Sequence, residues 1–318
     1  MILILAVTLL SFSSDKPAYR LFDQNGKKVK YSKMIKELKE ADIIFFGELH
    51  TDPIAHWLQL ELTKDLYESK KESLLLGAEM FESDNQLILN EYLDGMYPSD
   101  KFEAEMRLWG NYETDYKPLV EFARENHIPF IATNIPRRYA SMVHKEGFES
   151  LDSLTVEAKQ YMAPLPILYD PEVKCYKDML SMMGLGEKMQ ADSAKAMPGM
   201  EVTMPADSAK VMPADHGKGK PKNNMENLPK AQAAKDATMA HFILQNWSEG
   251  KTMFHFNGSY HSENFEGIVW HLKQQNPDLK IKTVSTVLQS EIDTLSEENK
   301  NSADFILCVP ESMTRTSR

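Results

Sequence analysis

The clearest hydrophobic pattern in the chain starts with a continuous apolar run, residues 43–46 (Ile-Ile-Phe-Phe). A polar tip, Gly47-Glu-Leu-His50, follows it. Such an uninterrupted run is typical of a strand buried on both faces. Gly47 should let the backbone turn, Thr51 or Asp52 can cap a helix, and Pro53 suits its first position. The apolar residues that follow recur at helical spacing: Ile54, Trp57, Leu58, Leu62 and Leu66. The stretch therefore predicts a strand, a polar tip and a helix.

The same alternation continues to the end of the chain. Further buried strands are expected at residues 73–79, 129–133, 252–256, 280–288 and 304–309. Segments with helical periodicity separate them, and residues 84–126 should form several helices, a helical subregion. Strands that alternate with helices predict an α/β fold, a mostly parallel sheet flanked by helices with right-handed crossovers.

Two segments depart from this pattern. Residues 1–14 start with an apolar stretch and continue with small polar residues, which resembles a secretory signal peptide and predicts export. Residues 184–230 are rich in Met, Ala, Pro, Lys and Asp and contain an imperfect duplication, so we expect a disordered low-complexity insertion. The remainder, within 15–318, is expected to form a single α/β domain.

Composition narrows the choice of partners. The formal net charge of the 318-residue chain is −11, which argues against a nucleic acid as partner. Cys175 and Cys308 are far apart in sequence and show no zinc-ligand spacing.

Two Gly-x-x-His motifs end predicted strands, Gly47-Glu-Leu-His50 and Gly258-Ser-Tyr-His261. Parallel strands share one carboxyl edge, where open α/β sheets bind their ligands. That edge should gather the polar residues that follow the strands: Glu48, His50, Glu79, Asn134, Arg137 and His261. His56, in the first turn of the helix after the first strand, can face the same place.

Three kinds of chemistry remain open for this set. His50, His261 and Glu79 could bind zinc, manganese or iron(II) and activate a water. The histidines and glutamates could also act as a metal-free acid and base. Alternatively, the histidines and Arg137 could hold the carboxylates of a larger ligand, with the helix N-terminus assisting the arginine. A surface arginine paired with a neighbouring carboxylate is the structural alternative for Arg137.

Taken together, these motifs resemble the ChaN-type haem-binding uptake lipoproteins, which form a wider group with the Tiki proteases and the erythromycin esterases. The resemblance covers roughly residues 40–290 without the insertion. The motifs that carry it are Phe46-Gly-Glu-Leu-His-Thr-Asp52 with His56, Glu79-Met-Phe81, the segment 109–116, Asn134-Ile-Pro-Arg137, Lys235-Asp-Ala-Thr-Met-Ala240 and Asn257-Gly-Ser-Tyr-His261.

The resemblance implies a haem-binding protein of bacterial iron or haem uptake. It implies a periplasmic or outer-membrane-associated homodimer that binds two stacked haems between its subunits and has an outer-membrane haem receptor as a possible partner. A tyrosine would ligate each iron. Tyr176 is the first candidate, and Tyr139 and Tyr169 remain open. The residues expected to contact haem are Tyr176, His50, His56, Arg137 and His261.

The wider group implies a rival function. Tiki-type proteins are metal-dependent proteases, and the corresponding catalytic set here would be Glu48, His50, Glu79 and His261 with a divalent transition metal. We expect a binding protein first and a metal-dependent hydrolase second. The sequence departs from the family pattern in three features: no lipobox cysteine follows residues 1–14, the Met-rich insertion is extra, and Thr51 precedes Asp52.

Overall fold

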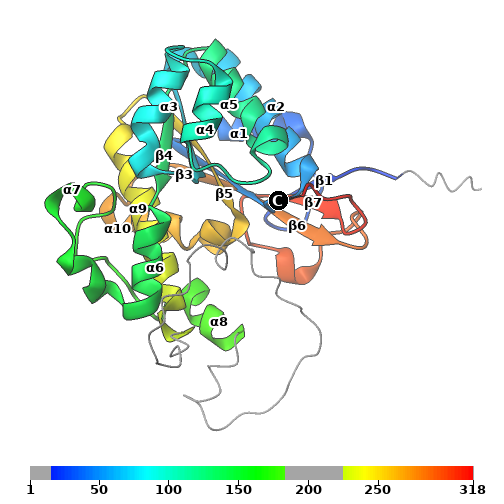
Figure 1. Cartoon of the computed structure of the whole chain (residues 1–318). Helices are drawn as coiled ribbons and strands as arrows, with labels where there is room; N and C mark the ends of the chain where they lie inside the picture. The colour runs from blue at the N-terminus through cyan, green and yellow to red at the C-terminus, as the bar shows by residue number, and fades with distance from the viewer. Residues whose placement is uncertain (1–15, 183–224, 318) are drawn as a thin grey trace, which may run out of the picture.

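The computed structural model describes residues 16–182 and 225–317. It confirms the predicted α/β fold, a seven-stranded sheet with helices on both faces (Figure 1). The predicted signal peptide, residues 1–14, and residues 184–224 of the predicted insertion lie outside the described residues.

The sheet is parallel except at one edge. Its strands in spatial order are β1 (Arg20–Asp23), β7 (Phe305–Pro310), β6 (Ile281–Gln289), β2 (Ile43–Glu48), β5 (Thr252–Gly258), β3 (Leu74–Glu82) and β4 (Phe130–Asn134). Only β1 runs antiparallel to its neighbour, β7. Strand β2 pairs with β5 and β6, and β5 also pairs with β3, so the two strands that carry the Gly-x-x-His motifs are direct neighbours.

Helices cover both faces of the sheet. The described α-helices are α1 (Tyr31–Leu38), α2 (Pro53–Lys70), α3 (Gln86–Leu93), α4 (Ser99–Glu105), α5 (Lys117–Glu125), α6 (Arg137–Glu146), α7 (Val156–Lys159), α8 (Lys174–Met182), α9 (Leu228–Asn246) and α10 (Ile268–Gln275). Helices α1 to α5 lie on one side of the sheet, and α9 and α10 lie on the other (Figure 1).

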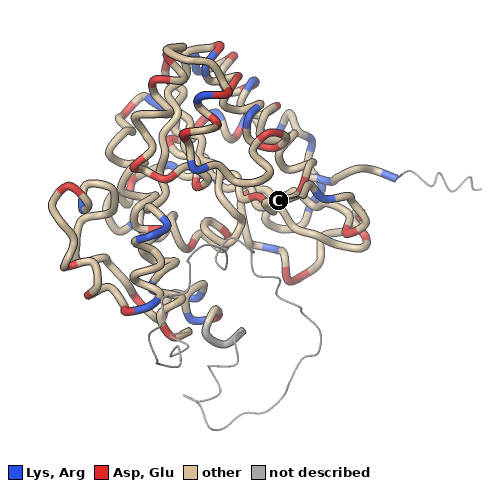
Figure 2. Tube along the Cα trace, in the orientation of Figure 1, with Lys and Arg blue, Asp and Glu red and all other residues tan. Residues whose placement is uncertain are grey.

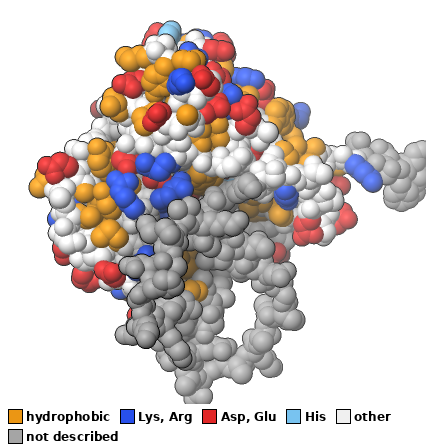
Figure 3. Space-filling view, viewed as in Figure 1, with side chains coloured by type: hydrophobic (Ala, Val, Ile, Leu, Met, Phe, Trp, Pro, Cys, Tyr) orange, Lys and Arg blue, Asp and Glu red, His pale blue; other side chains and the backbone are white. Residues whose placement is uncertain are grey.

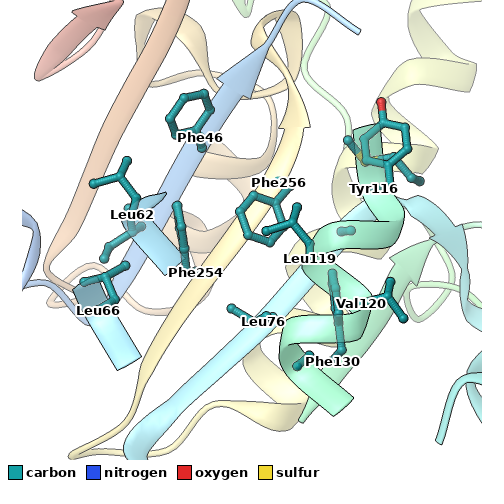
Figure 4. Packing of buried hydrophobic residues seen from close by; sticks show 14 of the residues in the cluster. Phe46, Leu62, Leu66, Leu76, Tyr116, Leu119, Val120, Phe130, Phe254 and Phe256 are labelled. Carbon is teal, nitrogen blue, oxygen red and sulfur yellow. The ribbon is translucent and has the colours of Figure 1, made fainter. Parts of the chain in front are cut away.

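The strand β2 shows why its sequence is apolar without interruption. Ile44 and Phe46 face the cluster under α2 and α5, whereas Ile43 and Phe45 face the cluster under α9 and α10. Neighbouring strands supply aromatic rings to the first cluster, including Phe254 and Phe256 of β5 (Figure 4). Both faces of the strand are buried, so its sequence does not alternate between apolar and polar residues.

Helix α2 begins as predicted, with the Asp52 carboxylate accepting hydrogen bonds from Ile54 N at 3.0 Å and Ala55 N at 2.9 Å. Trp57, one of the apolar residues at helical spacing, lies in α2 but is not buried. Its side chain is 48% exposed, and its ring contacts Tyr19 at a centroid distance of 6.0 Å.

The predicted end of the insertion at residue 230 is also corrected. Helix α9 already begins at Leu228, preceded by a 3-10 turn over Met225–Asn227. Pro229 occupies the first turn, where its missing N–H costs no helical hydrogen bond. The proline that suggested disorder in the sequence is therefore a helix-start signal.

Charged residues are spread along the helices and loops around the sheet (Figure 2). Among the residues that the structure describes, no helix has both the length and the apolar content required to cross a membrane. Cys175 and Cys308 are both buried and are not joined in a disulfide.

We predict a contrast between two identical substitutions. Leu76→Ala, at a fully buried position of β3 (Figure 4), should lower the free energy of unfolding by about 2–5 kcal/mol because it leaves a cavity. Leu87→Ala, where the side chain is 69% exposed, should change it by less than about 0.5 kcal/mol. Urea unfolding followed by circular dichroism measures both, and equal losses would contradict the assigned core.

Candidate functional site

Glu48 ends strand β2, and its carboxylate is buried among hydrogen-bond donors. Oε1 accepts a hydrogen bond from the Tyr116 hydroxyl at 2.6 Å and lies 3.0 Å from His50 Nδ1. Oε2 accepts from Gln59 Nε2 at 2.6 Å and lies 3.5 Å from His56 Nδ1. Burial by itself would raise the pKa of Glu48, but the adjacent His56 and His50 outweigh it and lower the pKa. Glu48 is therefore a carboxylate at neutral pH.

His50 is the member of the site that reaches the surface. Its side chain is 23% exposed, and its ring meets Trp109 edge-on at a centroid distance of 4.8 Å. Glu48 holds Nδ1, while Nε2 makes no hydrogen bond to any of the described residues. Nε2 is thus the nitrogen available to a ligand or substrate.

Gly47 and Gly258 each lie so close to the other Gly-x-x-His motif that a side chain at either position would collide with it. A Cβ at Gly47 would lie 2.8 Å from Ser259 Cα, and a Cβ at Gly258 would lie 2.7 Å from His50 Cε1. The expectation that Gly47 turns the chain is wrong, because β2 continues through it to Glu48. The motifs need glycine for close packing between adjacent strands.

His261 is buried between two carboxylates. Its Nε2 lies 3.3 Å from Glu79 Oε1, and its Nδ1 lies 2.5 Å from Asp236 Oδ1. Burial alone would lower the pKa of His261, but Glu79 and Asp236 raise it to about 10. Burial alone would raise the pKa of Glu79, yet His261 holds it well below its usual range. His261 is therefore a charged residue that neutralises the buried acids.

Side chains of the site also bind the backbone of Gly258, Glu79 and His50. Glu79 Oε2 accepts a hydrogen bond from Gly258 N at 2.8 Å, and Asn134 Nδ2 donates to Glu79 O at 2.9 Å. His56 Nε2 lies 3.1 Å from His50 O. The structure thus brings Glu48, His50, His56, Glu79, Asn134 and His261 together.

Arg137 lies beside this group, in a cluster of three arginines. The Arg137 and Arg107 guanidiniums both donate to the Glu82 carboxylate, and Arg107 and Arg138 both donate to Asp84. Arg137 thus has the carboxylate partner of the structural alternative. Three guanidiniums face two carboxylates, however, and the Arg137 side chain is 55% exposed. Figure 3 shows basic side chains gathered next to apolar ones on the face toward the viewer.

The three candidate tyrosines differ in their surroundings. The Tyr176 side chain has no exposed surface, and its hydroxyl donates to Asp236 Oδ2 at 2.8 Å and lies 3.3 Å from His271 Nε2. Burial and then the charge of Asp236 raise the pKa of Tyr176. Tyr139 is also buried, whereas Tyr169 is partly exposed.

Sequence reasoning placed Asp236 and Tyr116 within family motifs without giving either a role in the site, and it did not identify Gln59. Asp236 had a usable signal, because it is the single acidic residue in the alanine-rich stretch 231–240. A lone carboxylate on such a buried helix requires a cationic partner. Gln59 and Tyr116 show no comparable signal, since amphipathic helices commonly carry both residue types.

The predicted metal ligands lie around one point but are not arranged as a metal centre. A Cβ at Gly258 would lie 2.9 Å from His50 Nε2 and 3.6 Å from Glu79 Oε2. Both nitrogens of His261 face carboxylates. Within residues 16–182 and 225–317, no group of three or more His, Cys, Asp or Glu side chains could hold a metal ion.

A family model identifies the family, and a solved structure supports the fold. The family model described as haem-binding uptake, Tiki superfamily, ChaN matches residues 34–272. ChaN of Campylobacter jejuni, whose structure shows cofacial haem binding, shares the fold with a TM-score of 0.61 at 18% identity, covering 94% of this chain and 97% of that chain. The erythromycin esterase EreC in its open conformation gives a TM-score of 0.46 at 10% identity, covering 94% and 98%.

A curated plant protein matches part of the chain. Protein RETICULATA-RELATED 5, chloroplastic, of Arabidopsis thaliana is 29% identical over 135 residues. The match takes in 41% of this chain and spans only 18% of the plant protein's length.

The charged state of His261 predicts a pH dependence of stability. Its pKa is raised from 6.5 to about 10 in the folded protein, so its contribution is fully present below pH 6.5 and is lost as pH rises through about 10. The free energy of unfolding in urea should therefore fall between these pH values, and His261→Gln should remove this part of the slope.

A second measurement covers the case in which His261→Gln does not fold. In the wild-type protein, one imidazole should still be protonated at about pH 8 in an NMR titration of the histidine rings. If every histidine titrated near its ordinary pKa, the assigned ion pairs would be wrong.

Proposed function

We propose that the chain binds haem at the carboxyl edge of its sheet, beside His50, because it belongs to the family of haem-binding uptake proteins of the Tiki superfamily that includes ChaN. The observation that carries this placement is the His50 imidazole. Buried Glu48 fixes its Nδ1, its Nε2 makes no hydrogen bond to a described residue, and its side chain is 23% exposed beside the Trp109 ring. A partly exposed imidazole oriented next to an aromatic ring suits a flat, partly apolar ligand.

The residues at this edge fit the chemistry of haem. When bound, haem supplies the iron to be carried and two propionate carboxylates. Arg137 and its neighbours offer guanidinium groups with excess positive charge, which bind carboxylates through paired N–H donors. Lys235 on α9 interacts electrostatically with Glu79 and forms no ion pair with another described residue. His50 Nε2 and a tyrosine are both ligands that haem iron accepts.

Tyr161 is a better candidate for the tyrosine than Tyr176. The Tyr176 hydroxyl is bound to Asp236 inside the protein, and its raised pKa opposes tyrosinate formation. Tyr161 is partly exposed, and its hydroxyl has no hydrogen-bond partner in the described part of the chain. Its backbone carbonyl accepts a hydrogen bond from Ser83 Oγ at 2.7 Å, directly after β3. This contact supports a position of Tyr161 at the same edge of the sheet.

The proposal includes a homodimer and export. A haem that lies flat on an open edge keeps its other face exposed, and a second copy of the chain would cover it. The signal peptide expected at residues 1–14 would direct the protein to the periplasm or the outer membrane, where a haem receptor is a possible partner.

A haem titration with tyrosine variants tests this function. We expect a saturable Soret shift at about one haem per chain, with affinity about tenfold lower in Tyr161→Phe because the iron loses an axial ligand. Tyr176→Phe and Tyr169→Phe should bind as the wild type does. Absence of saturable binding by the wild type would reject the proposal.

Further measurements test the assignment of His50, the choice of tyrosine and the dimer. His50→Ala should weaken binding, and the urea midpoint measured alongside reports how much stability is lost when buried Glu48 loses its His50 partner. A loss confined to Tyr176→Phe would instead restore Tyr176 as the ligand and contradict the Tyr161 assignment. Sedimentation with and without haem measures the dimer, which should form with haem present.

A second candidate function is hydrolysis, and one observation favours it. The Glu48 carboxylate lies 3.0 Å from His50 Nδ1 and leaves Nε2 without a described hydrogen-bond partner, the arrangement of a general base oriented by an acid. The described residues favour the metal-free form, because both nitrogens of His261, one of the expected metal ligands with His50 and Glu79, face carboxylates.

Hydrolysis predicts a rate effect that haem binding does not. With an activated ester, His50→Ala should lower kcat by about 10²–10⁴-fold, the usual contribution of a general base. Glu48→Gln should lower kcat with little change in KM. A chelator distinguishes the metal-dependent form, which it inactivates, from the metal-free form. Equal hydrolysis by the wild type and His50→Ala would reject the candidate.

A further inference from the structure

The segment that follows β7, residues 311–317, returns to the tip of β2 and is attached there. Thr316 N donates a hydrogen bond to Thr51 O at 3.0 Å, and Thr316 Oγ1 donates to Asp115 Oδ2 at 2.7 Å. The Arg315 guanidinium donates to the Asp52 carboxylate. Apart from Met313, which packs against the main core, the segment contributes little apolar contact. Its attachment is therefore polar and concentrated at two acidic side chains.

Asp115 leads directly to the site. Its Oδ2 also accepts a hydrogen bond from Asn111 Nδ2 at 2.6 Å and lies 3.4 Å from His56 Nε2. Asn111 Nδ2 donates a second bond to His50 O at 2.7 Å, and His56 Nε2 lies 3.1 Å from the same oxygen. Thr316 is therefore linked through a single carboxylate to both side chains that hold the His50 backbone.

Asp52 provides a second connection. Its carboxylate has no exposed surface and caps the first turn of α2, which carries His56. Among the described residues, Arg315 is its only ion-pair partner. A buried carboxylate that loses its cation is strongly destabilised unless the surrounding structure moves. Arg315 therefore helps to fix the helix turn from which His56 reaches the site.

We propose that residues 311–317 are a positioning element for His50, with Thr316 acting through Asp115 and Arg315 acting through Asp52. Neither residue needs to touch the ligand. The segment limits how far the His50 backbone and the first turn of α2 can move, and so keeps Nε2 in one orientation. The positioning claim stands on the apoprotein, and its effect on haem rests on the proposed function.

Matched threonine variants test the proposal in the apoprotein. Thr316→Val keeps the shape but removes the hydroxyl, Thr316→Ser keeps the hydroxyl, and Thr314→Val is the control because Thr314 is exposed and has no described side-chain partner. The probe is diethyl pyrocarbonate, which acylates accessible imidazole nitrogens, and mass spectrometry measures the modification rate of His50.

We expect His50 modification to be about fivefold faster in Thr316→Val, the factor that the loss of one hydrogen bond produces. Thr316→Ser and Thr314→Val should react at the wild-type rate. An unchanged rate in Thr316→Val overturns the proposal. So does an equal acceleration of every histidine, because that result indicates general loosening of the fold.

Haem dissociation provides a second readout. Thr316→Val should release haem several-fold faster than the wild type, and Thr316→Ser should restore the rate. If the wild type binds no haem, the proposed function fails while the modification rates still decide the positioning claim. If haem dissociation and His50 modification are both unchanged in Thr316→Val, positioning by the segment is rejected while haem binding stands.

Discussion

Buried carboxylates at the carboxyl edge of the sheet are the constraint on which the rest of the site depends. Glu48 and Glu79 end or nearly end two strands, and each is almost fully buried. An unpaired carboxylate in such a place costs several kcal/mol, so the fold must bring cationic or hydrogen-bonding groups to it. His261, from the turn that follows β5, supplies the cation for Glu79, and its other nitrogen pairs with Asp236 of α9.

The close packing of adjacent strand tips makes this pairing geometrically possible. Glycine at positions 47 and 258 allows each tip to approach the other within contact distance. Any side chain there would push His50 or Ser259 away. The paired motifs are therefore one packing unit, and the two histidines end in different environments because the strands are offset around it.

Because of this difference in environment, His261 has a structural role, whereas His50 is the candidate for contact with a ligand. His261, buried between two acids, is a fixed charge whose raised pKa leaves it little capacity for proton transfer near neutral pH. His50 has one nitrogen beside the Glu48 carboxylate, and its other nitrogen makes no hydrogen bond to a described residue. A ligand would meet an oriented imidazole backed by buried negative charge and bordered by arginines. Haem binding and hydrolysis both make use of that arrangement, and the family membership favours the former.

The sequence by itself determined the fold class, the order of the strands and helices, and the residues gathered at the carboxyl edge. Local signals carry these features: apolar runs for strands, a capping Asp52 with Pro53 for α2, and a carboxyl edge common to parallel strands. It could not assign roles to the two histidines, because burial depends on neighbours distant in sequence.

Only the tertiary structure decided which acids face which imidazoles. Asp236 reaches His261 from 25 positions away, and Thr316 reaches Asp115 from 201 positions away. It also decided that Gly47 serves packing between strands and that the Tyr176 hydroxyl is held inside the protein. These outcomes depend on how helices and strands dock, and no local pattern of polar and apolar residues encodes docking, since many partners would satisfy the same pattern.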